Sequence, residues 1–377
     1  MKYVLVSELV LLSNLSIVLS DRIQLESCMS EQDKKFVQNR SEIVFIYDAQ
    51  NANPNGNPMS SDDSPRKDPQ TEQAIVTDVR LKRYLRDQLV DDNYPVYIQD
   101  LENENAPTRE ELAERLVPEE ITDLLKSDDL EASGEEIIDN FLENAIDVRL
   151  FGAVFSFSSD DSDEIESVTD GFPANLTGPV QFSPAFSLNA PVQENTNFDA
   201  LTSVIATQEG KKSGGYDLDD KRLKYAIFPF HGIVNENAAD STHLTEKDIK
   251  LLDKALWRSI KNQTVTRSKV GQEPRFYVRV EYSQDNFHLG DLHTSVNLAE
   301  ETKSPKQLRN GSEVVLDLTE LVSRLQRHET QLETLYLNWS DVVDYKYDGT
   351  ILDSDSILEV ISTEVDCDIE KVDPYDI

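Results

Sequence analysis

The sequence predicts an α+β fold in which helices cover one face of a β-sheet. Three observations predict it: an apolar run at 43–47, two capped amphipathic helices beginning after Thr77 and Thr245, and an alternating strand at 275–282. The order along the chain is strand, helix, strands, helix, strand, which fits a ferredoxin-like sandwich. With 377 residues, the chain has room for one large domain or two ordinary ones.

The first strand and the first helix are marked by their composition. Residues 43–47 are apolar on both faces, which suits a central strand ending at Asp48, and the Asn- and Pro-rich run 51–58 predicts turns. Thr77 caps a helix that runs to about Val90. The basic side chains of this helix share one arc, which is predicted either to be solvated or to bind an anion: Arg80, Lys82, Arg83 and Arg86.

The middle of the chain is predicted to alternate insertions with strands. Residues 91–147 are predicted to form an acidic insertion with helices at 108–125 and 133–146. Strands are predicted at 148–157 and 225–234.

Two stretches between these strands have a different character. The stretch 178–189 is predicted to be extended, and Pro184 within it favours a sheet edge or a bulge. Residues 190–224 have weak periodicity and several lysines around glycines, which predicts a protruding loop or hairpin.

The last third of the chain begins with a helix that Asp248 strengthens by completing a capping box with Thr245. Residues 276–282 then alternate between apolar and polar side chains, which predicts an antiparallel strand with one buried face. Residues 312–377 are predicted to form an acidic C-terminal region with one helical stretch near 316–335.

The net charge of −36 comes from 72 acidic and 36 basic side chains, and taken alone it argues against a nucleic-acid partner. However, residues 91–147 hold 19 acids and 3 bases, and residues 312–377 hold 17 acids and 4 bases. These two segments carry −29 of the −36. An acidic surface of this kind is typical of proteins from a salt-rich cytoplasm.

Residues 1–40 are predicted to be an N-terminal extension. The apolar run after Lys2 is like that of a signal peptide, but Glu8 and Asn14 interrupt it and no cleavage site follows. We expect residues 1–28 to be a mis-called upstream extension. Cys28 and Cys367 build no disulfide framework and no zinc site, and no other run spans a membrane, so a cytoplasmic protein without a membrane partner is predicted.

The signatures of common enzymes are absent: there is no Walker loop, no G-x-G-x-x-G and no G-x-S-x-G. His288 and His293 have a spacing unsuited to one helix face, so no metal and no cofactor are predicted. Asp48 is the best catalytic candidate and would make the chain a metal-dependent single-stranded RNA nuclease. The alternative interpretation of Asp48, a turn cap, is favoured.

Three basic clusters remain, at 66–86, 211–224 and 267–279, and aromatic side chains lie near the third. Basic groups that follow phosphates, together with aromatic rings that stack bases, are typical of surfaces that bind single strands. Phe276 and Tyr282 share the apolar face of their strand and are predicted to lie in the core instead.

Six ordered stretches over about residues 40–310 resemble one family, the Cas-seven family of CRISPR-associated backbone subunits in type I-B Cascade complexes, in a haloarchaeal-like form. The stretches are 43–48 with Asn53-Pro54-Asn55-Gly56-Asn57-Pro58, Pro65-Arg66-Lys67-Asp68, 76–86, Arg149-Leu150-Phe151-Gly152-Ala153, Gly178-Pro179-Val180-Gln181-Phe182, and Thr266-Arg267-Ser268-Lys269.

The resemblance implies an RRM-like palm at 41–90 and 148–311, helical fingers at 91–147 and a thumb at about 190–224. It implies binding of a CRISPR guide RNA, further copies of the chain in a helical filament, other Cascade subunits, target DNA and, indirectly, a recruited helicase-nuclease. With the basic clusters it gives the candidate RNA contacts: Asn53, Asn55, Gly56, Arg66, Lys67, Lys82, Arg83, Arg86, Lys211, Lys212, Arg267 and Lys269.

Overall fold

The computed structural model describes residues 35–56, 64–99, 112, 115–118, 121, 130–154, 175–197, 219–266 and 268–376. Most of the predicted N-terminal extension lies outside these residues, as do Lys211, Lys212 and Arg267. The prediction of an extension is wrong for residues 35–40, which belong to the fold. The Val37 side chain is buried and the Val37 N–H donates to Leu244 O, while Arg40 forms an ion pair with Glu236.

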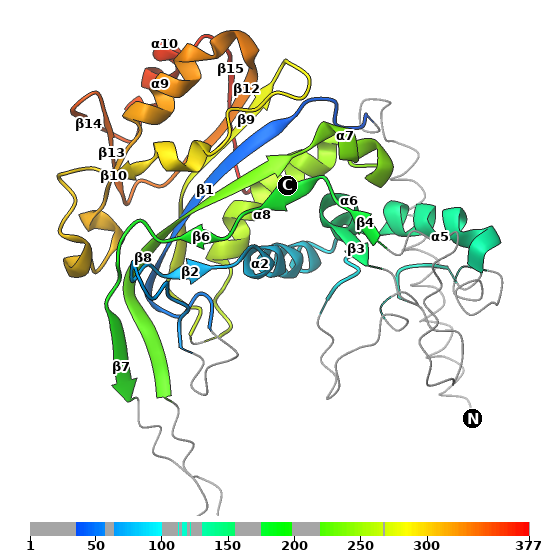
Figure 1. Ribbon diagram of the computed structural model, residues 1–377, viewed down its shortest axis with the longest axis horizontal. Helices are drawn as coiled ribbons and strands as arrows, with labels where there is room; N and C mark the ends of the chain where they lie inside the picture. The colour runs from blue at the N-terminus through cyan, green and yellow to red at the C-terminus, as the bar shows by residue number, and fades with distance from the viewer. Residues whose placement is uncertain are drawn as a thin grey trace, which may run out of the picture.

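One seven-stranded sheet organises the molecule (Figure 1). Six strands follow one another in the order β15-β12-β9-β1-β8-β5, and β7 also pairs with β8. All of these pairs are antiparallel except that of β12 with β15. The strands are β1 (Ser41–Ala52), β5 (Val180–Phe182), β7 (Gln193–Asn197), β8 (Asp219–Val234), β9 (Gln272–Tyr282), β12 (Leu332–Trp339) and β15 (Asp368–Lys371).

The mixed α+β class is confirmed. Along the chain the elements β1, α2 (Asp78–Asp91), β5, β8, α8 (Glu246–Lys261) and β9 follow one another. This is the strand–helix–strand–strand–helix–strand order of a split βαβ unit. The extended stretch around Pro184 is also confirmed: β5 ends before this proline, β6 (Ala185–Phe186) begins after it, and β5 is the sheet edge.

Helices α2 and α8 begin where the sequence predicts. The Thr77 side chain accepts a hydrogen bond from Arg80 N, and Thr245 and Asp248 form the complete capping box. Each cap satisfies N–H groups that have no partner inside the first turn. The apolar faces of both helices pack on one face of the sheet, against Phe45 and other buried side chains of β1.

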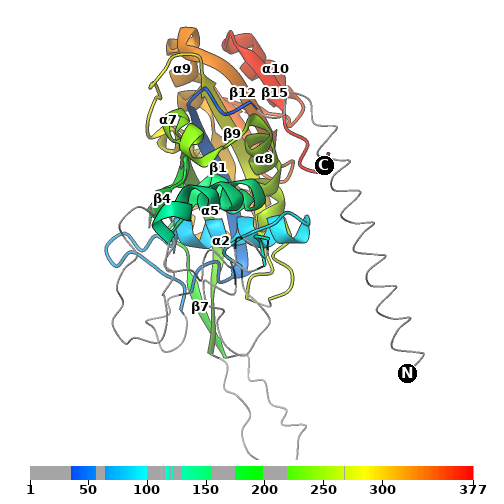
Figure 2. The ribbon, with the colours of Figure 1, turned by 90° about the vertical axis from the view of Figure 1, so that its right-hand side faces the viewer.

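The other face of the sheet is covered as well, so the prediction of helices on one face only is wrong. The cover is built from residues after 290, which lie over this face of the sheet (Figures 1 and 2). It packs on the buried side chains of Val44, Ile46 and Phe276. It contains β10 (Asn297–Leu298), β11 (Val315–Asp317), β13 (Asp344–Tyr347) and β14 (Thr350–Leu352), with helices α9 (Thr319–Arg327) and α10 (Ser356–Glu364).

Two further predictions fail in this region. Strand β9 is buried on both faces, not on one, although Phe276 and Tyr282 lie in the core as predicted. The helix predicted near 316–335 is α9, which ends at Arg327, and Leu332 already begins β12. Because β12 and β15 complete the main sheet, residues 312–377 are part of one body with the preceding chain.

A third cluster of buried apolar side chains lies beside the sheet and includes Tyr97, Ile137 and Phe141. Its elements are α5 (Leu130–Asn144), α6 (Ile146–Phe151), β3 (Gly152–Val154) and β4 (Asn175–Thr177). The strand predicted at 148–157 is therefore wrong: helix α6 replaces its first half, and β3 pairs with β4 outside the main sheet. The helix predicted at 108–125 falls mostly outside the described residues.

The remaining described elements are short. They are β2 (Ile75–Val76), which pairs with β6, helix α7 (Glu236–Ala239), and five 3₁₀ turns at Asp240–Thr242, Leu292–Ser295, Pro305–Gln307, Gly311–Glu313 and Glu329–Gln331. Within the described ranges, none of the helices is long and apolar enough to cross a membrane.

Glu42 on β1 is a buried carboxylate that fastens the 290–292 segment to the sheet. Its oxygens accept hydrogen bonds from the Tyr282 hydroxyl (2.9 Å), Gly290 N (3.0 Å) and Leu292 N (2.9 Å), and Oε1 lies 2.8 Å from His231 Nε2. Burial raises the pKa of Glu42, but the hydrogen bonds from His231 and Leu292 outweigh burial and hold the pKa below the ordinary value of 4.5.

The Glu42→Gln variant should lose stability in a pH-dependent way. A carboxyl whose pKa is lower in the folded chain stabilises it above the unfolded pKa, and this contribution disappears as the pH falls through the folded pKa. We expect the difference in unfolding free energy between the native chain and the variant to be largest above the ordinary pKa of 4.5 and to shrink as the pH falls below it. Urea unfolding at several pH values measures it, with Glu333→Gln on the exposed side of β12 as control. A difference independent of pH would contradict this role.

Candidate nucleic-acid interface

The end of β1 is the meeting point of several stretches that resemble the Cas-seven family. Asn53 N donates to Ser268 O (2.8 Å), and Lys269 Nζ donates to Asn53 O (2.6 Å). Gln50 N donates to Gly271 O (2.8 Å), and a Cβ on Gly271 would lie 2.3 Å from Gln50 O. The loop between α8 and β9, which carries the Thr266–Lys269 stretch, is therefore fixed against the end of β1.

The same end of β1 also holds the start of helix α2. Asn55 Oδ1 accepts hydrogen bonds from Thr77 N and Thr77 Oγ1, both at 2.9 Å. Arg66 N donates to Asn55 O, and Arg66 Nε donates to Gly56 O, both at 3.2 Å. The turn 53–56 therefore positions the capping residue of α2 and the Arg66 side chain together.

Asn53 is one of the candidate RNA contacts, but its backbone N–H already donates to Ser268 O. The side chains of Asn53 and Asn55 are also buried, each residue being 4% exposed. Both asparagines therefore build the turn. Lys67, the next basic residue along the chain, donates from Nζ to Pro191 O (2.7 Å) at the foot of the β7/β8 hairpin.

Lys82 and Arg86 lie one turn apart on α2, and both approach the ring of Phe151. Lys82 Nζ is 5.7 Å and the Arg86 guanidinium carbon 5.3 Å from the ring centroid. Lys82 Nζ also donates to Gln181 Oε1 (2.8 Å), and Arg86 Nε donates to Asp147 Oδ2 (2.8 Å). Burial lowers the pKa of Lys82, and Asp78 opposes the shift, so a bound anion would favour the charged ammonium.

Gly152 and Gly178 explain how Phe151 comes to lie there. Two chain segments cross at these glycines with no room for side chains: a Cβ on Gly152 would lie 2.0 Å from Leu176 O, and one on Gly178 would lie 2.1 Å from Phe151 C. Gly152 also has a φ of +73°, which side-chain-bearing residues rarely adopt. Two stretches of the family resemblance, 149–153 and 178–182, thus meet next to Lys82.

The remaining candidate on α2, Arg83, keeps 40% of its side chain exposed and pairs with Asp87 at 2.8 Å. Arg86 differs, because its partner Asp147 is fully buried and also accepts hydrogen bonds from Tyr97 N and Ile98 N. Arg86 therefore has a structural task, fastening α2 to the lobe that contains α5.

The structure differs most from the sequence prediction at the third basic cluster, 267–279. Arg275 and Arg279 are buried, not surface cations: Arg275 pairs with Asp48 (2.6 Å), and Arg279 pairs with Asp253 (2.8 Å). Lys269 from the same cluster lies beside the turn 53–56. Arg267 lies outside the described residues.

Asp48 is neither a turn cap nor a catalytic group open to solvent. It lies inside β1, is 1% exposed, and accepts hydrogen bonds from Arg275 Nε and the Tyr225 hydroxyl, both at 2.6 Å. Burial raises the pKa of Asp48, and Arg275 opposes the shift. In the part of the chain that the structure describes, no three His, Cys, Asp or Glu side chains are arranged to hold a metal ion. The contacts of Asp48 are those of a buried structural ion pair.

The β7/β8 hairpin brings further bases to the end of β1. Lys221, Arg222 and Lys224 lie on β8, and Arg222 Nη1 donates to Asn51 O (3.1 Å). The candidate contacts named from the sequence do not include these three, although the signal is present. Arg222 and Lys224 alternate with the buried Leu223 and Tyr225, as expected for a strand whose other face packs in the core.

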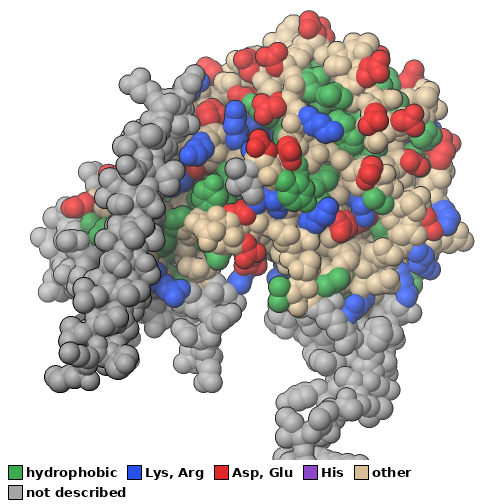
Figure 3. All heavy atoms as spheres, turned by 180° about the vertical axis from the view of Figure 1, so that it is seen from behind, with side chains coloured by type: hydrophobic (Ala, Val, Ile, Leu, Met, Phe, Trp, Pro, Cys, Tyr) green, Lys and Arg blue, Asp and Glu red, His purple; other side chains and the backbone are tan. Residues whose placement is uncertain are grey.

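The charges are unevenly distributed over the described surface. In Figure 3, Asp and Glu side chains are most numerous over the upper part, and Lys and Arg side chains become more frequent towards the lower margin. Together with the contacts above, this defines a basic rim that follows the turn 53–56, Arg66, Lys67, the exposed side of α2 and Lys269.

Comparisons with known proteins place these features in the class of CRISPR-associated proteins. A family model described as CRISPR-associated protein Cas7 matches residues 39–319. A curated CRISPR-associated protein Cas7 from Haloferax volcanii is 49% identical over 303 residues, which cover 79% of this chain and 86% of the relative. The chain belongs to the Cas7 family, so the resemblance drawn from the sequence motifs is confirmed.

Solved structures with similar chains are more distant. One is titled a CRISPR RNA-guided surveillance complex, pre-nicking: its chain has a TM-score of 0.46 and 12% identity, with 86% of this chain and 100% of that chain covered. Another, titled a CRISPR RNA-guided surveillance complex, has a TM-score of 0.40 and 14% identity, with 86% and 99% covered.

Proposed function

We propose that this chain is a backbone subunit of a type I-B Cascade complex, which binds a CRISPR guide RNA along its phosphates and assembles on it with further copies. The observation that carries the proposal is the meeting of the family-like stretches in the basic rim at the end of β1 and along α2. Stretches far apart in the sequence therefore converge on this basic rim.

In this proposal, the unit from β1 to β9 is the palm, the lobe with α5 forms the fingers, and the β7/β8 hairpin is the thumb. Lys211 and Lys212, which follow β7 and precede β8 in the sequence, would contact the RNA or the next copy. Because β7 and β8 pair from Gln193 to Asn197, the arms are held as one ribbon that can project beyond the palm.

Binding on the rim would be largely independent of sequence, because lysine and arginine contacts to phosphates do not read base edges. The bases of the guide would remain available to pair with target DNA, and that pairing would supply specificity. The face on which RRM-type sheets stack bases is covered here by residues after 290, which favours a path along the rim. Cutting of DNA would belong to a recruited helicase-nuclease, and other Cascade subunits would be further partners.

The double substitution Lys82→Ala plus Arg83→Ala tests the rim. Arg86 is left intact, because removing it would leave the buried Asp147 carboxylate without its cation. We expect weaker binding of every single-stranded RNA sequence alike, and a salt dependence of log K that is shallower by about 0.7 for each phosphate that is no longer neutralised. Fluorescence anisotropy over a KCl series measures both quantities.

Lys303→Ala plus Arg327→Ala is the matched control, since both side chains are more than half exposed and the charge change is the same. Equal salt slopes for the rim variant and the native chain would show that the RNA does not lie on α2. Sequencing of RNA that co-purifies with the native chain tests the wider proposal, because guides of one repeat-derived length are expected.

A further inference from the structure

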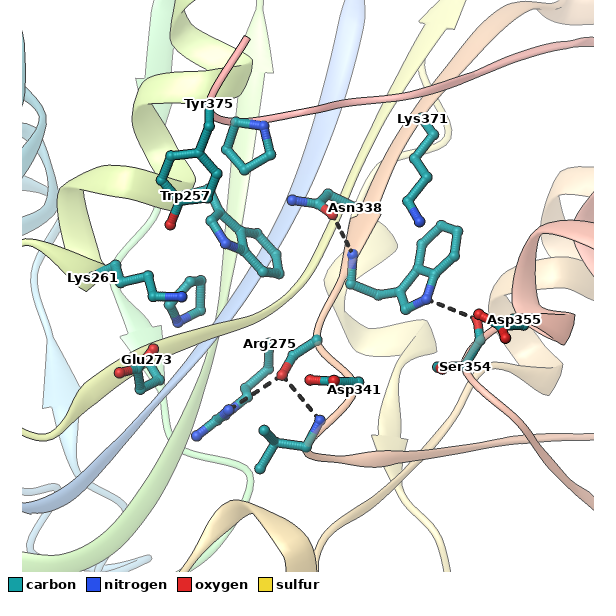
Figure 4. A pocket seen from close by; sticks show the side chains of 15 residues that line it. Trp257, Lys261, Glu273, Arg275, Asn338, Asp341, Ser354, Asp355, Lys371 and Tyr375 are labelled. Carbon is teal, nitrogen blue, oxygen red and sulfur yellow. Dashed lines mark hydrogen bonds between the residues drawn. The ribbon is translucent and has the colours of Figure 1, made fainter.

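A cavity of about 650 Å³ opens between the last turn of α8, the start of β9 and the end of β12 (Figure 4). Its wall contains Trp257 from α8 and Trp339 from β12, which are the two tryptophans of the chain. The cavity is of the size that holds small ligands. Its far wall, from β12 to Tyr375, is made of residues beyond the 39–319 match to the family model.

The wall combines aromatic rings with hydrogen-bonding groups. Trp339 Nε1 donates to Ser354 O (2.9 Å), which fixes the ring, and Lys371 Nζ lies 4.4 Å from the ring centroid. Asn338 Oδ1 accepts from Trp339 N (3.0 Å), so the amide nitrogen of Asn338 points towards Trp257 across the opening (Figure 4).

The cavity lies at the same end of the sheet as the basic rim. Strand β9 pairs with β1 through Gln272 and Ala49, and with β12 through Phe276 and Trp339. The loop that carries Lys269 runs from Lys261, in the cavity wall, to Gln272 at the start of β9. A strand of RNA that leaves the rim along this loop therefore arrives at the cavity.

We propose that this cavity binds an unpaired nucleobase of the guide strand, an inference that rests on the proposed function. An indole ring offers a face for stacking, and the Asn338 amide offers donors to a base edge. Lys261 at the opening is placed to meet the adjoining phosphate. The wall holds three carboxylates, Glu273, Asp341 and Asp355, and three cations, Lys261, Arg275 and Lys371. Arg275 is already paired with Asp48, so a bare phosphate gains little here and the base supplies the recognition.

Tryptophan emission tests the proposal directly, because both indoles line the cavity. The full chain is titrated with a labelled single-stranded RNA and with an abasic ribose-phosphate oligomer of the same length. Label anisotropy reports binding, and tryptophan emission reports occupancy of the cavity. We expect both oligomers to bind, and only the RNA to quench the emission.

Two substitutions separate stacking from packing. Trp339→Leu keeps an apolar side chain but removes the ring, and is expected to weaken RNA binding by about fivefold or more. Trp339→Phe keeps an aromatic face and should bind RNA much as the native chain does. Equal affinity of the leucine variant and the native chain would overturn the proposal, once circular dichroism shows that both are folded.

The other outcomes are equally decisive. RNA that binds without changing the emission, or an abasic oligomer that quenches as strongly, overturns the base site but leaves the proposed function standing. Absence of RNA binding in the anisotropy overturns the proposed function and the base site with it. A last measurement uses the native complex after its RNA has been digested. If acrylamide still does not quench the tryptophan emission, a segment of a partner protein fills the cavity, and the base site is overturned.

Discussion

The Asp253→Asn variant is expected to lose about 3–5 kcal/mol of unfolding free energy. Asp253 on α8 accepts hydrogen bonds from Arg279 Nε (2.9 Å) and Nη2 (2.8 Å), and the two side chains are each 2% exposed. The Tyr277 hydroxyl donates to the same carboxylate. Asparagine preserves the shape but removes the charge, which leaves the guanidinium buried with too little compensation.

Urea unfolding at neutral pH measures this loss. Glu320→Gln is the matched control, because Glu320 pairs with Arg327 at 2.8 Å but both side chains are about 60% exposed. Exposed pairs of this kind contribute less than about 1 kcal/mol. A loss for Asp253→Asn no larger than that of the control would mean that Arg279 finds another partner when Asp253 is neutral.

The Gly178→Ala variant is expected to lose about 3 kcal/mol or more, because its Cβ would overlap backbone rather than a movable side chain. The nearest atoms are Phe151 C at 2.1 Å and Gly152 N at 2.2 Å. Relief requires the two segments to separate, which displaces Phe151 from Lys82 and Arg86. We therefore expect weaker RNA binding in the same variant.

Gly349→Ala separates the steric effect from the general cost of replacing glycine. Gly349 has a φ of +78° and no atom within 4 Å of the added Cβ, so only the backbone strain of about 1 kcal/mol applies. Thermal unfolding of both variants, with anisotropy of bound RNA, makes the comparison. A Gly178→Ala chain as stable as the Gly349→Ala chain would show that the crossing can open without cost.

The local signals in the sequence were sufficient to predict the two helices that pack on the sheet. Thr77, Thr245 and Asp248 cap α2 and α8 through partners three residues away, so composition alone could reveal them. The run 148–151 shows the opposite case. Its apolar, partly β-branched residues favour a strand, but Arg149 ties the segment into a helical turn by bonds to Leu142 O and to Asp248.

The strand β9 shows why its burial on both faces could not be predicted. Arg279 and Glu281 alternate with apolar residues and so predict an exposed face, yet Arg279 is buried because Asp253 neutralises it. The partner lies on another element, and no pattern within the strand reveals it. For the same reason the sequence could name the basic residues of the candidate site, but not that Arg86 is committed to the buried Asp147.

The covering of the sheet by late residues has a consequence for the chain as it leaves the ribosome. Strands β1, β8 and β9 are complete once Tyr282 has been made, but the face that carries Val44, Ile46 and Phe276 meets its main cover only when residues 314–365 follow. Strand β15, which pairs beside β12, lies within the last ten residues. A polypeptide cut short by early termination would carry a bare apolar face and an unpaired strand edge, and such chains aggregate or are degraded. Only chains that extend through β15 would therefore have both the cover and this edge of the sheet in place.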